Sequence, residues 1–119
     1  MSVATSARVL IRIVELVIVF GDGVAKVIPI EWRKGMTAED ALKRASEKPH
    51  GISFRTIMQS LGAFETEIDG EVNDTHGNVH RGWMYCVNGE LAKVGCGQYE
   101  LKPSDIVRWE YTVYDHSAA

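Results

Sequence analysis

The sequence predicts an α+β fold with a mostly antiparallel sheet and one main helix packed on one face of that sheet. Most of the chain consists of short runs of alternating apolar and polar residues, separated by Gly and Asn turn signals, which indicates strands joined by hairpins. One segment with helical spacing, Ala38 to Ala45, interrupts these runs. The length of 119 residues, with 45% hydrophobic and 24% charged residues, predicts one folded domain over residues 1–119.

The first predicted strand covers residues 8–20, which are rich in β-branched side chains. Asp22-Gly23 can form a tight hairpin turn, and apolar residues at alternate positions towards Trp32 predict a returning strand. Because Pro29 has no backbone N–H, we expect this second strand to lie at a sheet edge. Residues 1–7 and 115–119 are expected to be flexible ends.

A helix is predicted to begin at Thr37, because Thr37 to Asp40 has the Ser/Thr-x-x-acid form of a capping box. Four small or apolar side chains then share one helical face: Ala38, Ala41, Leu42 and Ala45. Pro49 and Gly51 predict the end of the helix. Residues 52–62 fit either a helical turn or a short strand, and both remain open.

The second half of the chain predicts strands only. Around residues 64–68, apolar residues alternate with acidic ones, and we interpret the acidic set as one exposed stripe: Glu65, Glu67, Asp69 and Glu71. A polar loop follows over residues 73–81. Asn88-Gly89 is a strong hairpin signal after the alternating run from Trp83, and residues 107–113 predict a last strand with one buried side.

Composition excludes several classes of protein. The formal charge of -3 offers no broad cationic surface for nucleic acid. The most apolar stretch, Val9 to Phe20, is interrupted by Arg12 and Glu15 and is too short to span a bilayer, so we expect no membrane partner. Gly21 to Gly23 follows this stretch as a turn and does not resemble a signal-peptide cleavage site, which favours a cytoplasmic location. Two cysteines are too few for an all-cysteine metal centre.

A series of motifs covers residues 62–111: Gly62-Ala63-Phe64, Ile68-Asp69-Gly70, Gly82-Trp83-Met84-Tyr85, Val87-Asn88-Gly89-Glu90, Val94-Gly95, Tyr99-Glu100-Leu101-Lys102, and Asp105, Val107, Trp109 and Tyr111. With them, the chain resembles the transcobalamin C-terminal-like β-grasp family, which occurs as a domain of unknown function in many bacterial proteins. The resemblance extends over most of the chain from residue 16 and implies a β-grasp fold. Cys86 stands where the family usually has an aromatic residue, and Ser104 where it usually has glycine.

In the vitamin carriers of the family that this chain resembles, the domain covers one face of cobalamin. The resemblance therefore implies cobalamin as a ligand. We therefore predict a binding module whose hairpin and preceding loop contact a small flat molecule or a protein partner. The ligand-binding candidates are Trp83, Tyr85, Asn88, Glu90 and Lys93. We predict no enzymatic activity, because no phosphate loop, nucleophile elbow or nucleotide fingerprint is present. The alternative is a self-assembly module that forms a homo-oligomer through the long strand at Val9 to Phe20.

A further alternative is metal binding. His76 and His80 have a spacing seen in zinc sites, and two thiols follow them, which gives the candidate ligands His76, His80, Cys86 and Cys96. Nothing in the sequence brings these four to one point, so we expect no resident zinc. Cys86 and Cys96 flank the hairpin turn, and a disulfide or two free thiols remain open.

Overall fold

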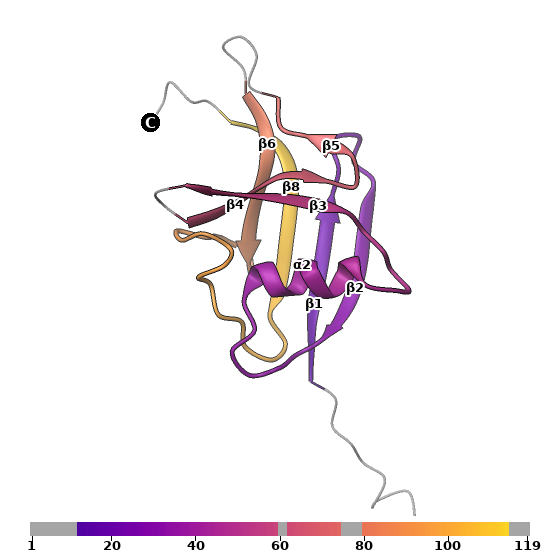
Figure 1. Cartoon of the computed structure of the whole chain (residues 1–119), viewed down its shortest axis with the longest axis vertical. Helices are drawn as coiled ribbons and strands as arrows, with labels where there is room; N and C mark the ends of the chain where they lie inside the picture. The colour runs from indigo at the N-terminus through magenta and orange to yellow at the C-terminus, as the bar shows by residue number, and fades with distance from the viewer. Residues whose placement is uncertain (1–11, 60–61, 75–79, 115–119) are drawn as a thin grey trace, which may run out of the picture.

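The computed structural model describes residues 12–59, 62–74 and 80–114, which form two β-sheets and one α-helix. The larger sheet has the strand order β2-β1-β8-β6-β7 and the smaller one β3-β4-β5 (Figure 1). The elements are β1 (Ile13–Val19), β2 (Ala25–Glu31), α2 (Ala38–Ser46), β3 (Phe54–Gln59), β4 (Gly62–Ile68), β5 (Glu71–Val72), β6 (His80–Val87), β7 (Glu90–Leu91) and β8 (Ile106–Tyr114). Among the described strands, only the pair β1 and β8 is parallel, so the predicted α+β class with mostly antiparallel pairing is confirmed. The prediction of a single sheet is wrong, because the described strands form two sheets.

Strand β1 lies inside the larger sheet. It pairs with β2 on one side and with β8 on the other, and its inward residues Val14, Leu16 and Ile18 are fully buried. The predicted self-assembly through this strand is therefore wrong for residues 13–19, because both strand edges are already hydrogen-bonded within the chain. Residues 1–11 and 115–119, including the start of the predicted strand and both predicted flexible ends, lie outside the described residues.

Strand β2 forms one edge of this sheet, as Pro29 predicted. Gly23 has φ of 89° in the turn between β1 and β2, a conformation that glycine adopts without strain. The Asp22 carboxylate accepts a hydrogen bond of 2.9 Å from the Val24 N–H in the same turn. The residues of the turn itself, Asp22 and Gly23, therefore determine where the chain reverses between β1 and β2.

Helix α2 covers one face of the larger sheet and packs against β1 and β2 (Figure 1). Its inward residues are the four predicted from spacing, and all are fully buried: Ala38, Ala41, Leu42 and Ala45. The predicted capping box is present. The Thr37 hydroxyl accepts from the Asp40 N–H at 3.2 Å, and the Asp40 carboxylate accepts from the Thr37 N–H at 2.9 Å.

Replacing Thr37 by alanine should lower the free energy of unfolding by about 1 kcal/mol, because the Asp40 N–H loses its side-chain acceptor. Urea unfolding followed by circular dichroism measures this change. Thr37→Ser is the matched control, since it keeps the hydroxyl. An equal loss in both variants would show that the methyl group, rather than the cap, stabilises the helix start.

The ambiguous segment at residues 52–62 contributes strand β3, which pairs with β4 in the smaller sheet. This sheet crosses the same face of the larger sheet as α2 (Figure 1), and β4 contacts β6. The register shifts once: Arg55 is opposite Glu67, but the next residue, Thr56, is opposite Glu65. Thr66 is thus an extra residue in β4, which is the pattern of a β-bulge.

Strands β6 and β8 pair from His80 to Val87, and the Asn88-Gly89 turn follows as predicted. The Asn88 side chain holds this turn against β8, because its amide donates to Asp105 at 2.8 Å and its oxygen accepts from the Ile106 N–H at 2.9 Å. Nearby Ser104 has φ of 74°, a conformation that favours glycine. In the described part of the chain, no helix is long and apolar enough to cross a membrane.

Candidate functional site

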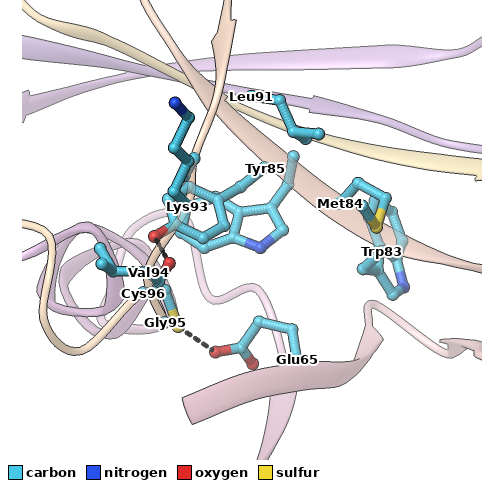
Figure 2. A pocket seen from close by; sticks show the side chains of 11 residues that line it. Glu65, Trp83, Met84, Tyr85, Leu91, Lys93, Val94, Gly95 and Cys96 are labelled. Atoms are coloured by element: carbon cyan, nitrogen blue, oxygen red, sulfur yellow. Dashed lines mark hydrogen bonds between the residues drawn. The ribbon is translucent and has the colours of Figure 1, made fainter. Parts of the chain in front are cut away.

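A cavity of about 230 Å³ lies where the two sheets meet, between β4 of the smaller sheet and β6 and β8 of the larger one. The segment at residues 91–96, which follows the hairpin turn, closes one side (Figure 2). Most of the wall is apolar or aromatic, with Glu65 and Cys96 as polar members and Lys93 at the exposed rim. The cavity therefore combines a large apolar surface with a few polar groups, as ligand pockets do.

Tyr85 and Trp109 form the aromatic part of the wall. They are paired across β6 and β8, and their rings stack at 5.2 Å with an interplanar angle of 24°. The Tyr85 hydroxyl donates to the Val94 carbonyl, which ties the closing segment to β6. Burial raises the pKa of Tyr85, so the hydroxyl keeps its proton and remains a donor.

Trp83 belongs to the core as much as to the cavity. Its side chain is only 7% exposed, and its Nε1–H donates to the Glu71 carbonyl at 2.8 Å. Its ring also makes edge contacts with Phe20 at 5.6 Å and with Tyr111 at 5.4 Å. Trp83 is one of the predicted ligand-binding residues, but the structure surrounds its ring with core neighbours and leaves only 7% of the residue exposed.

Glu65 is the main polar group of the cavity, and it is only 3% exposed. Its two carboxylate oxygens lie 2.9 and 3.0 Å from the Thr56 hydroxyl, which donates to them, and the Cys96 thiol donates to Oε1 at 3.4 Å (Figure 2). Burial raises the pKa of Glu65 to about 7. Burial and the neighbouring Glu65 raise the pKa of Cys96, so the thiol stays protonated.

The prediction that Glu65 belongs to an exposed acidic stripe is wrong. The bulge at Thr66 shifts the alternation of β4 by one residue, so that Glu65 and Ile68 are both buried. The other three acidic residues each have a partner: Glu67 pairs with Arg55, Asp69 with Lys26, and Glu71 accepts from the Gly21 N–H. No sequence signal marks the bulge, because Thr66 fits a regular strand equally well.

The other sequence-predicted ligand residues have different surroundings. Asn88 is occupied by the turn contacts described above, and Glu90 is exposed beside the turn. Lys93 is exposed and lines the rim of the same cavity as Tyr85 (Figure 2). Of the five predicted residues, Trp83, Tyr85 and Lys93 therefore line one cavity.

The four predicted metal ligands do not form a cluster among the described residues. His76 lies outside the described residues. His80 and Cys86 are at opposite ends of β6, six positions apart, which on a strand is about 20 Å. No disulfide joins Cys86 and Cys96, so the disulfide alternative is not formed.

A different group could hold a metal ion. Ligand atoms of Glu39, Glu65 and Cys96 all lie within 4.8 Å of one another, beside the cavity and at the first turn of α2. Thiolate and carboxylate are both ligands that zinc accepts. The Cys96 thiol donates its proton to Glu65, so a bound ion would have to displace that proton.

The arrangement of strands and cavity can be compared with known proteins. Residues 35–113 match the family described as "Domain of unknown function (DUF4430)". The chain belongs to this family. No curated protein matches the DUF4430 chain.

Two solved structures have a similar fold. A "putative metal binding protein" from Ruminococcus gnavus has a TM-score of 0.69 at 16% identity, and the match covers 85% of this DUF4430 chain and 96% of that chain. Haptocorrin in complex with Cbi has a TM-score of 0.71 at 16% identity, and the match covers 96% of this chain and 29% of haptocorrin. At these identities the likeness establishes a shared fold.

Proposed function

We propose that this DUF4430 chain is a single, non-enzymatic binding module that takes a small flat molecule into the cavity between its two sheets. The observation that carries the proposal is the cavity itself, which is lined both by the stacked pair Tyr85 and Trp109 and by the buried Glu65. Aromatic and apolar walls bind a planar ligand by contact area, while a few polar groups fix its orientation. The described residues of this cavity show no nucleophile activated by a neighbouring base, which is why we propose binding without catalysis.

Cobalamin is the first ligand to consider. The motifs that resemble the transcobalamin C-terminal-like β-grasp family run through β6, the closing segment and β8, which together make most of the cavity wall. The fold is also similar to part of haptocorrin, whose solved complex contains Cbi. We therefore propose a β-grasp assignment and a ligand site on the hairpin side of the fold.

The match covers only 29% of haptocorrin, so most of that protein has no counterpart in this chain. A cobalamin bound here would contact the module through one face, and the remaining faces would need a second protein or domain. The apolar side chains at the cavity mouth, Leu91 and Val94, are 57% and 44% exposed and would lie beside such a partner. Affinity of the isolated chain for cobalamin should accordingly be modest, because little ligand surface is removed from water.

Two ligands test the proposal: cobalamin and indole, a small neutral planar probe. Amide-correlation NMR spectra should show shifts of the Trp109 indole N–H and of residues 91–96 with at least one of them. Leu91→Asp, which places a charge at the apolar mouth, should weaken that binding about tenfold. Met58→Asp on β3 is the matched control, because Met58 is 76% exposed and lies away from the cavity.

Each outcome decides one part of the proposal. Shifts with cobalamin that are lost in Leu91→Asp support the vitamin ligand. Shifts with indole alone support a pocket for a smaller molecule and overturn the proposal that cobalamin is the ligand. If neither ligand shifts these residues, or if both aspartate variants bind as the wild type does, the cavity is not the binding site.

A further inference from the structure

The carboxylate of Glu65 has hydrogen-bonding capacity beyond its contacts in the protein. A carboxylate offers about four acceptor positions. Thr56 supplies one proton, shared between the two oxygens at 2.9 and 3.0 Å, and Cys96 supplies one proton to Oε1. Oε2 therefore has room for another donor, and Glu65 lines the cavity from which a ligand would approach.

The charged side chains around Glu65 do not offset the negative charge of its ionised carboxylate. Glu39, from the first turn of α2, raises the pKa of Glu65, and Lys43 from the next turn lowers it, but both effects are smaller than that of burial. The Cys96 thiol and the Tyr85 hydroxyl also border the site, and both are protonated donors. The ammonium of Lys93 is at the exposed rim. A cation entering the cavity would thus offset a buried negative charge.

The aromatic wall favours the same kind of ligand. Tyr85 and Trp109 line the same cavity as the Glu65 carboxylate, and the negative face of an aromatic ring attracts a cation within about 6 Å. A planar cation with N–H bonds could use the ring for contact area and the carboxylate for directed hydrogen bonds. The cavity of about 230 Å³ limits such a ligand, or the part of it that enters, to about one or two rings.

We propose that the cavity selects flat ligands that carry a cationic nitrogen with N–H donors, such as an amidinium or a protonated nitrogen heterocycle, and that Glu65 Oε2 accepts their hydrogen bond. This inference rests on the proposed function, since it names the class of ligand for the same cavity. It also gives Glu65 a role beyond packing: it distinguishes a cationic ligand from a neutral one of equal shape.

Benzamidine, benzamide and benzoate test the inference, because the three have nearly the same size and shape but differ in charge. The probes are titrated into the wild-type chain and followed by the Trp109 indole N–H and the amides of residues 91–96. A chelator in the buffer prevents a trace metal ion at Glu39, Glu65 and Cys96 from contributing to the signal. We expect benzamidine to bind about tenfold more tightly than benzamide, because hydrogen bonds to charged groups are stronger than those between neutral groups. Benzoate should bind most weakly, because its charge has the same sign as that of ionised Glu65.

Glu65→Gln should remove the preference for benzamidine while benzamide still binds, since glutamine keeps the shape of the wall without the charge. Glu67→Gln is the matched control on the same strand, where the carboxylate contacts Arg55 and not the cavity. The affinity of the wild type for benzamidine should also rise with pH through about 7, because Glu65 must ionise to pair with the amidinium. That rise should be absent in Glu65→Gln.

The inference and the proposed function fail in different ways. If benzamide and benzamidine bind the wild type equally, the cationic class is wrong and the planar-ligand pocket stands. If the preference persists in Glu65→Gln, another group recognises the cation. If indole, cobalamin and all three probes leave the cavity residues unshifted, the proposed function itself is wrong.

Discussion

Trp109→Ala should lower the free energy of unfolding by about 3–5 kcal/mol, the usual cost of removing a large buried aromatic side chain. Trp109 is 1% exposed and lies on β8 between Ile18 of β1 and Tyr85 of β6, so it joins the centre of the larger sheet. The truncation would also leave Tyr85 without its stacking partner. Urea unfolding followed by circular dichroism measures the loss, since the variant lacks one of the tryptophans used for fluorescence.

Arg108→Ala is the matched control, because Arg108 is the preceding residue on β8, faces solvent and forms a salt bridge of 3.3 Å with the partly exposed Glu110. Its effect should stay below about 1 kcal/mol. If Trp109→Ala unfolds the chain completely, Trp109→Phe provides a milder truncation whose smaller loss can still be measured. A loss for Trp109→Phe no larger than that for Arg108→Ala would contradict the central role of Trp109 in the core.

The second large effect is a dependence of stability on pH caused by Glu65. Its pKa is 4.5 ordinarily and about 7 in the folded chain, where burial disfavours the charge. Between these values the unfolded chain loses the proton first, so stability is greatest below about pH 4.5 and falls as the pH rises to about 7. At about 1.4 kcal/mol for each pH unit, Glu65 should cost about 3 kcal/mol above that range.

Glu65→Gln cannot ionise, so it should remove this fall, and the variant should gain stability relative to the wild type as the pH rises through the window. Urea unfolding at a series of pH values measures the difference. Glu67→Gln removes a carboxylate from the same strand but keeps Glu65, and therefore keeps the fall. A wild-type minus Glu65→Gln difference that does not change with pH would mean that Glu65 is solvated in the folded state.

Local chemistry determined much of the fold. The capping box at Thr37, the apolar face of α2 and the turns at Gly23 and Asn88 depend on residues a few positions apart, so the sequence contains the information directly. The edge position of β2 followed from Pro29 for the same reason. The motifs from residue 82 onward resemble the transcobalamin C-terminal-like β-grasp family, and the chain has a fold similar to part of haptocorrin at 16% identity.

The site depended on contacts that no local pattern encodes. Whether residues 52–62 form a helix or a strand was decided by pairing with β4, and the bulge at Thr66 arises in that pairing. Regular alternation along β4 would place Glu65 on the surface, but the bulge places it in the buried wall of the cavity. The Cys96 thiol donates a hydrogen bond to Glu65, which lies 31 positions earlier in the sequence, and no spacing in the sequence indicates this contact.

By itself, then, the sequence determined the class of fold, the helix and its cap, and the hairpin turns. Only the tertiary structure decided that β1 has no free edge and that the carboxylate of Glu65 is the polar centre of the cavity. The reason is physical: strand order and register fix which side chains meet, and a single extra residue in one strand exchanges the buried face for the exposed one.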